Sequence, residues 1–337
     1  MHTGNSIERR NDMNIVVIGT GSMGKNHARV CSALGVLAGV FDADENSAKR
    51  VASSYGCRSY GTVDEIMNDK DIDGVIIATP TSHHYDIASK AMLSGKHVLL
   101  EKPVCASEDE AKRLIRLAKD AGIVFEVGQI ERYNPVVRFA RESLASGKFG
   151  ELLTVATRRV SNFPGRIRDV GCILDIGIHD IDAIRYVVGS EVKSVHASAG
   201  RHKADGVEDH ANIMLGFENG KTGVLEVNWM TPMRVRKMFL TCSGAFVELD
   251  YMNQAARISS SAYLDTENKS AYMPQVEYQN QDIMLKKQEP LMNEIEDFIG
   301  AIKEKRKPLV TGEDGLAALR IANAAVESYK TGKIIEL

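Results

Sequence analysis

An aspartate and a histidine four residues apart form the pair in this sequence best suited to acid–base chemistry. Asp175 and His179 lie within 170–188 (VGCILDIGIHDIDAIRYVV), a segment predicted to be a helix. At about 100° per residue their side chains fall on one narrow stripe, together with Asp182 and Tyr186. Most of the remaining circumference is apolar. Such a helix is buried, so its polar stripe must be paired internally or must line a cavity.

This pair supports three interpretations. An aspartate one turn before a histidine orients the imidazole and favours its protonated form, which suits a base that removes a hydroxyl proton. A histidine that is merely hydrogen-bonded within the core is the second interpretation. The third is a metal ion bound by the pair, but no third ligand is evident at a readable spacing, so no metal is expected.

A lysine follows a short apolar run that is predicted to be a strand. The run 97–100 (HVLL) ends in Glu101, Lys102 and Pro103. Ligands bind at the carboxyl ends of strands in a parallel sheet. Lys102 could there neutralise a phosphate, hold a sugar hydroxyl or transfer a proton. A solvated lysine on a loop is the alternative.

Residues 19–24 (GTGSMG) follow the apolar run 14–18 and precede a helical segment, which is the context of a dinucleotide-binding turn. The first glycine permits the tight turn, the second lets a pyrophosphate approach the backbone, and the third lets helix and strand pack closely. The free N–H groups of the helix N-terminus can bind phosphate. We expect the cofactor to contact Gly19, Gly21, Ser22, Met23 and Gly24.

Asp42 stands 23 positions after the first glycine of this turn, at the end of the next predicted strand. An acidic side chain at this place accepts hydrogen bonds from both ribose hydroxyls. It also repels a 2′-phosphate, and neither Ala43 nor Asp44 offers a cation to bind one. The sequence therefore favours NAD over NADP.

The elements around these residues divide the chain into two domains. Up to about residue 130, short apolar runs alternate with helix-like segments. Strands that are apolar on both faces and separated by helices form a parallel sheet covered on each side. The sequence predicts a flexible tail over 1–12 and a doubly wound α/β Rossmann domain that binds NAD over 13–130.

Beyond about Gly150 the predicted strands are longer and alternate in polarity, as in 222–230 (TGVLEVNWM). This alternation indicates a sheet with two unlike faces. We expect an α+β domain with an open, mainly antiparallel sheet over 131–337, with C-terminal helices able to pack back on the Rossmann domain. The polar stretch 259–270 is expected to be a loop. An open sheet face favours subunit pairing, so a homodimer or homotetramer is expected.

The composition excludes several classes of function. The 337 residues are 44% hydrophobic and 26% charged, with a net charge of −3, so nucleic acid and anionic membranes are not expected partners. Five scattered cysteines argue against a disulfide framework and a zinc cluster. No apolar run approaches the roughly 18 residues of a membrane span, and the start lacks the apolar centre of a signal peptide, so neither is expected. A cytoplasmic location is expected.

Four motifs in this order resemble the glucose-fructose oxidoreductase / inositol dehydrogenase / MocA family. They are GTGSMG at 19–24, TPTSHH at 79–84, EKP at 101–103 and G-x-x-L-D-x-G-x-H-x-x-D at 171–182. The resemblance implies a Rossmann domain, a C-terminal α+β domain with an open sheet, and reversible hydride transfer between NAD(P) and a sugar-like carbinol. One departure is Cys172, where many relatives continue a run of glycines.

The resemblance also implies roles for individual residues. Lys102 corresponds to the catalytic lysine of the family, and Asp175 and His179 to its substrate-binding and general-base pair. Further cofactor contacts are expected beside the nicotinamide, from Thr79, Pro80, His84, Glu101, Lys102 and Gln129.

Two segments indicate the substrate. Residues 130–135 (IERYNP) and 286–298 resemble the branch that acts at C3 of UDP-N-acetylglucosamine, which implies oxidation of that hydroxyl to a ketone. Arginine suits the phosphates of such a small-molecule substrate. Substrate contacts are expected from Lys102, Asp175 and His179 and also from Arg132, Tyr133, Arg159 and Arg166.

Three other functions stay open at this stage. An inositol or monosaccharide dehydrogenase would need no diphosphate contacts. A non-catalytic NAD-binding regulator would not need all of Lys102, Asp175 and His179. A hydrolase that works through tightly held NAD would release no NADH.

Overall fold

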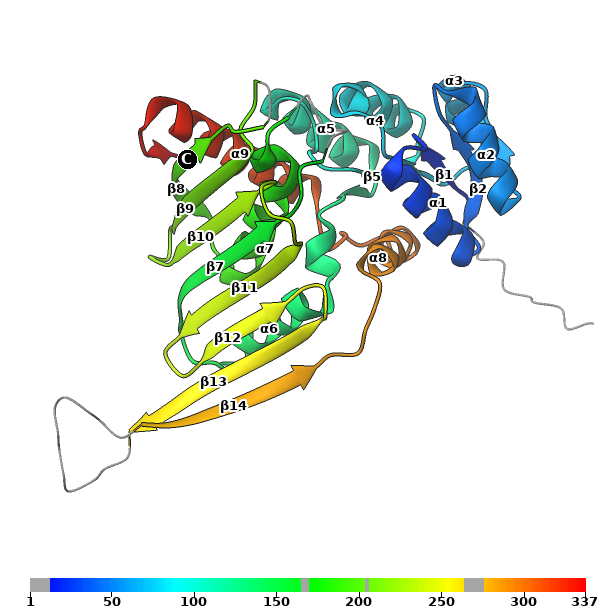
Figure 1. Ribbon diagram of the computed structural model, residues 1–337. Coiled ribbons are helices and arrows are strands. Elements are labelled where there is room, and N and C mark those ends of the chain that lie inside the picture. The colour runs from blue at the N-terminus through cyan, green and yellow to red at the C-terminus, as the bar shows by residue number, and fades with distance from the viewer. Residues whose placement is uncertain (1–12, 165–169, 204–205, 264–275) are drawn as a thin grey trace, which may run out of the picture. The chain divides into compact units, whose positions relative to one another are not determined.

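The computed structural model of the chain describes residues 13–164, 170–203, 206–263 and 276–337 (Figure 1). The chain divides into two compact units. The first contains the chain up to Gln129 and Leu291–Leu316, and the second contains Ile130–Pro290 and Ala317–Leu337.

The first unit is built on a six-stranded parallel sheet with the order β3-β2-β1-β4-β5-β6. This is the Rossmann order, in which the strand sequence reverses beside β1. Its strands are β1 (Ile15–Ile18), β2 (Leu37–Phe41), β3 (Arg58–Ser59), β4 (Gly74–Ile77), β5 (His97–Leu100) and β6 (Phe125–Val127). Its helices include α1 (Ser22–Ala33), α2 (Glu45–Tyr55), α3 (Val63–Asn68), α4 (His84–Leu93), α5 (Glu108–Ala121) and α8 (Pro290–Glu304).

Local chemistry explains where these elements begin and end. Every residue of β1 and β4 is buried, as expected for strands covered on both faces. Helix α5 begins with a capping box, in which Ser107 and Glu110 each accept from the other's backbone amide. It ends at Gly122, whose φ of 67° is the left-handed conformation that glycine adopts without strain. The predicted doubly wound domain is confirmed.

The second unit contains a nine-stranded sheet with the order β14-β13-β12-β11-β7-β10-β9-β8-β15. Among its described strands only β7 and β10 pair in parallel, so the predicted mainly antiparallel sheet is confirmed. The strands are β7 (Leu152–Val160), β8 (Val192–Gly200), β9 (His210–Phe217), β10 (Thr222–Asn228), β11 (Val235–Cys242), β12 (Phe246–Asp250), β13 (Ala255–Tyr263), β14 (Val276–Met284) and β15 (Ile335–Glu336).

The loop expected over 259–270 is wrong at its start, because residues 259–263 belong to β13 and pair with β14. This pairing satisfies part of their backbone hydrogen-bonding groups even though the residues are mostly serine. Residues 264–270 lie outside the described part of the chain.

Helices cover one face of this sheet (Figure 1). They are α6 (Pro135–Ala145), α7 (Ile178–Val188) and the later part of α9 (Gly312–Thr331). The opposite face leaves Met214, Val224 and Phe246 between 40% and 53% exposed. Self-association through this face stays a prediction. Among the described helices none is long and apolar enough to cross a membrane.

A buried carboxyl group lies in the core of the first unit. Glu294 of α8 is 0% exposed, and neither of its carboxylate oxygens has a hydrogen-bond partner among the described residues. Burial, and then the nearby carboxylates of Glu101, Glu126 and Asp297, raise the pKa of Glu294 well above its ordinary value. The folded protein therefore holds a proton on Glu294 that the unfolded chain releases above a pH of about 4.3.

We expect this proton to make stability fall as the pH rises above that value, because the native state then binds more protons than the unfolded state. Glu294→Gln keeps the shape of the side chain and removes the titration. Its melting temperature should exceed that of the wild type at pH 8, by roughly 2–4 °C for each kcal/mol gained, and should approach it at pH 4.5. Thermal unfolding at both pH values measures this. Glu296→Gln, on the exposed side of the same helix, is the control, and an equal offset at both pH values would contradict the prediction.

Candidate active site

Close packing leaves no room for a side chain at two of the three glycines in the turn after β1, and the third faces open space. Gly19 has a φ of 94°, and a Cβ there would lie 2.6 Å from the carbonyl oxygen of Ala78. A Cβ on Gly24 would lie 1.8 Å from the carbonyl oxygen of Gly19. A Cβ on Gly21 would meet nothing within 4 Å, and no side chain caps the α1 N-terminus that begins at Ser22. Close packing therefore requires two of the glycines, and the third faces open space beside free helix N–H groups.

Asp42 lies just beyond β2 and is tied to this turn. Its Oδ2 accepts from the Thr20 amide at 2.6 Å and the Thr20 hydroxyl at 2.9 Å, and its Oδ1 accepts from the Asp44 amide at 2.9 Å. Partial burial acts to raise the pKa of Asp42, but these hydrogen bonds outweigh it and lower that pKa. A carboxylate therefore stands where a ribose would bind.

Buried polar atoms follow two other strands of the same sheet. The hydroxyl oxygen of Thr79, just after β4, and both amide atoms of Gln129, just after β6, have no hydrogen-bond partner among the described residues. Such atoms cost free energy unless a partner satisfies them. A nicotinamide carboxamide offers both a donor and an acceptor. Together with the glycine turn and Asp42, these atoms fit a bound dinucleotide.

Lys102 is anchored by a buried contact between β5 and α1. The Glu101 carboxylate contacts His27 Nε2 at 2.8 Å and accepts from the Lys102 amide at 3.2 Å. Burial alone would raise the pKa of Glu101, but the His27 contact outweighs it and lowers that pKa. Lys102 itself is half-buried. His27 was not among the residues predicted from the sequence, although its place on the buried face of α1 was a usable signal.

His84 is buried at the start of α4, and Pro80 precedes it. The His84 ring nitrogens lie 2.9 Å from the Thr79 carbonyl oxygen and 3.0 Å from the Pro103 carbonyl oxygen. Burial lowers the pKa of His84. The ring therefore joins the loop after β4 to the loop that carries Lys102.

The segment with Asp175 and His179 belongs to the second unit. Asp175 lies in a π-helical turn, η3 (Ile173–Gly177), and His179 in the first turn of α7. The single α-helix predicted over 170–188 is therefore wrong at its start. The Ile173 amide donates to the Glu208 carboxylate at 3.1 Å, so a residue distant in sequence binds the start of the π-helical turn. Both Asp175 and His179 are half-buried. π-Helical turns recur at functional sites.

The arginines expected to bind substrate contact protein carboxylates. Arg132 Nε and Nη2 donate to Asp182 at 2.8 and 2.6 Å, and Arg159 donates to Asp180 through two bonds of 3.0 Å and to Glu131 at 2.8 Å. Both arginines are buried, with 4% and 3% exposed. A substrate phosphate would have to displace these carboxylates. Tyr133 is also buried, and Arg166 lies outside the described residues.

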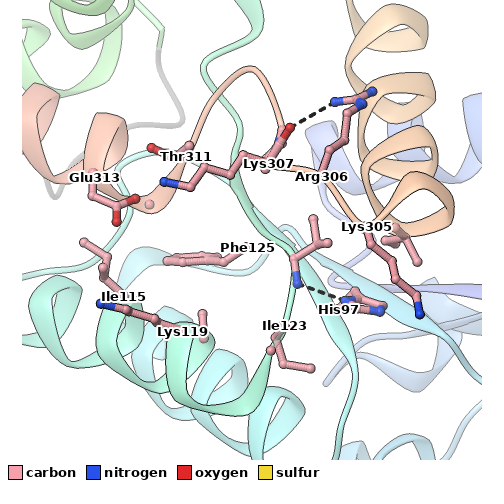
Figure 2. Close-up of a pocket in the computed structure, with 16 residues that line it drawn as sticks. His97, Ile115, Lys119, Ile123, Phe125, Lys305, Arg306, Lys307, Thr311 and Glu313 are labelled. Atoms are coloured by element: carbon pink, nitrogen blue, oxygen red, sulfur yellow. Dashed lines mark hydrogen bonds between the residues drawn. The ribbon is translucent and has the colours of Figure 1, made fainter.

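A cavity of about 720 Å³ lies elsewhere on the first unit (Figure 2). His97 and Phe125, which line it, begin β5 and β6, so the cavity is at the amino ends of the strands. Cofactors of such sheets bind at the carboxyl ends, where the glycine turn lies. Among the described residues, no group of three or more His, Cys, Asp or Glu side chains is arranged to hold a metal ion.

The fold and the glycine turn define an NAD-binding oxidoreductase. Residues 13–129 match the oxidoreductase family with an NAD-binding Rossmann fold, and residues 137–248 match the GFO/IDH/MocA C-terminal domain. The chain belongs to this GFO/IDH/MocA family, which confirms the resemblance read from the motifs.

Several relatives align over nearly the whole chain. The UDP-N-acetylglucosamine 3-dehydrogenase of Acidithiobacillus ferrooxidans is 31% identical over 92% of this chain and 94% of its own, and its structure superposes with a TM-score of 0.83. The inositol 2-dehydrogenase of Rhizobium meliloti is 30% identical, covering 95% and 98%. The scyllo-inositol 2-dehydrogenase (NAD(+)) of Bacillus subtilis is 28% identical, covering 95% of each chain. The prediction of a dehydrogenase acting on a sugar or sugar-like CH–OH group is confirmed.

Asp182→Ala should destabilise the second unit strongly. It leaves the Arg132 guanidinium buried without its bidentate carboxylate, which costs roughly 3–5 kcal/mol of unfolding free energy. Urea unfolding measures this loss. Asp282→Ala, which removes the partner of the exposed Arg257, is the control and should change little. A similar small effect for both variants would show that the Arg132–Asp182 pair is not structural.

Proposed function

We propose that this protein oxidises the 3-hydroxyl of UDP-N-acetylglucosamine to the 3-keto sugar nucleotide, with NAD as the hydride acceptor. The observation that carries the proposal is the 31% identity, across 92% of the chain, to a UDP-N-acetylglucosamine 3-dehydrogenase. The segments 130–135 and 286–298 resemble the same branch and support it.

The chain retains residues for each step of an alcohol oxidation. His179 accepts the proton of the hydroxyl, and Asp175, which precedes it by four residues, orients the imidazole. The Lys102 ammonium stabilises the negative charge that develops on the oxygen. When bound, the cofactor supplies the hydride acceptor. The glycine turn, Thr79 and Gln129 would hold it in the first unit.

The preference for NAD over NADP rests on Asp42. The carboxylate is kept ionised by the amides of Thr20 and Asp44, so a 2′-phosphate beside it would meet a like charge. The two ribose hydroxyls of NAD can instead donate hydrogen bonds to it.

A second candidate is the oxidation of a free polyol such as inositol. The 30% identity to an inositol 2-dehydrogenase over 95% of the chain favours it. The same Lys102, Asp175 and His179 would serve, because the chemistry at the carbinol is unchanged. The two candidates differ in whether a diphosphate must be bound.

NADH absorbance distinguishes these candidates. The purified protein is mixed with NAD, or in parallel with NADP, and with UDP-N-acetylglucosamine, its uronic acid, myo-inositol or glucose. We expect NADH with UDP-N-acetylglucosamine and little reduction of NADP. Signal with myo-inositol alone would favour the second candidate. No NADH formation with any of these substrates would contradict both candidates and would favour a regulator or an enzyme that retains its NAD.

His179→Ala should lower kcat by about 10²- to 10⁴-fold, the usual contribution of a general base. NADH affinity, measured by fluorescence titration, should stay close to that of the wild type, because the dinucleotide-binding residues lie in the first unit. His196→Ala, on strand β8, is the control. Undiminished turnover in His179→Ala would remove this residue from the mechanism.

A further inference from the structure

We infer that Arg236, with Arg234 beside it, binds the diphosphate of the substrate. The inference rests on the proposed function, and it identifies the residues of the second unit that recognise the charged part of a sugar nucleotide.

Arg236 is a half-buried cation with no hydrogen-bond acceptor among the described residues. It lies on β11, and its side chain is 36% exposed. Its nearest carboxylate is that of Glu131, with Nη1 and Oε1 3.7 Å apart, and within the described part of the chain its guanidinium donates no hydrogen bond. A guanidinium has five N–H donors. Arg132 and Arg159, in contrast, each hold a carboxylate through two hydrogen bonds.

The charge of Glu131 is shared. The same Oε1 accepts from Arg159 Nη2 at 2.8 Å, so Arg159 holds it more closely than Arg236 does. Burial, and then the positive charge of Arg159, lower the pKa of Arg236. An arginine still stays protonated, so Arg236 is a cation with incomplete compensation. A bound anion would supply both the missing charge and the missing acceptors.

Arg236 lies on the face of the sheet that carries the catalytic segment. It stands directly opposite Arg159 in the β11–β7 register, so both side chains project from the helix-covered face. Arg159 in turn binds Asp180, the residue that follows His179. An anion held by Arg236 would therefore lie close to the start of α7.

The arginines near Arg159 and Arg236 in the sequence differ in position. Arg158 projects from the opposite face of the sheet and pairs with Glu226, so it points away from α7. Arg234 is exposed, precedes Arg236 by two residues and adds to the positive potential around it. Two guanidinium groups suit the several oxygens of a diphosphate, which accept bidentate hydrogen bonds.

Isothermal titration calorimetry of UDP binding tests the inference. The protein is first saturated with NADH, so that UDP cannot bind at the dinucleotide site. Arg236→Gln should weaken UDP binding about ten- to hundredfold, as expected for the loss of hydrogen bonds to a charged group. Arg236→Lys should lie between this variant and the wild type. Arg158→Gln, from the other face of the same sheet, should bind UDP unchanged. KM for UDP-N-acetylglucosamine should rise in parallel, with little change in kcat.

The outcomes separate the two proposals. Unchanged UDP affinity and KM in Arg236→Gln, with a wild type that oxidises UDP-N-acetylglucosamine, would overturn the inference and leave the proposed function standing. A wild type that neither binds UDP nor forms NADH with this substrate would overturn both. If Arg236→Gln does not fold, UDP binding is measured in Arg236→Lys and in Arg234→Gln, which changes an exposed residue. Unchanged UDP binding in both variants would overturn the inference.

Discussion

The bidentate ion pair between Arg159 and Asp180 is the contact that fixes the start of α7, and with it His179, in the second unit. It joins β7 to the first turn of α7, and Glu131 extends it to the 3₁₀ turn η2 (Ile130–Tyr133). Buried charges are tolerated only when they are paired and hydrogen-bonded. Asp180, the residue next to His179, cannot be separated from Arg159 at low cost. This ion pair therefore acts together with apolar packing to set the rotation of α7, and with it the direction of His179.

In the first unit, α1 also carries a buried contact between ionisable side chains. The N-terminus of this helix faces the glycine turn, and its buried His27 contacts Glu101 at the end of β5. The same helix therefore has an N-terminus able to bind phosphate and also anchors the backbone next to Lys102. Glu294 lies in the same core as a protonated carboxyl group, where a second full negative charge beside Glu101 would be costly.

Much of the candidate site was readable because its signals are local. The glycine turn, Asp42 and Lys102 each lie at a strand end, and the strand–turn–helix pattern places them without knowledge of distant contacts. The stripe of Asp175 and His179 was also readable, although a constant 100° per residue could not reveal the π-helical turn. That turn depends on Glu208, which contacts it from 35 positions further along the chain.

The family, the two kinds of sheet and the candidate residues for proton transfer and dinucleotide binding could be predicted from the sequence, because they follow from periodicity and short motifs. Which arginines are already paired with carboxylates could be seen only in the folded chain. Arg132, Arg159 and Arg236 are the same residue type, yet two are buried against carboxylates. The guanidinium of the third, Arg236, donates no hydrogen bond to the residues that the structure describes. A guanidinium binds whichever anion the fold brings closest, and that pairing is made by strands and helices distant in sequence.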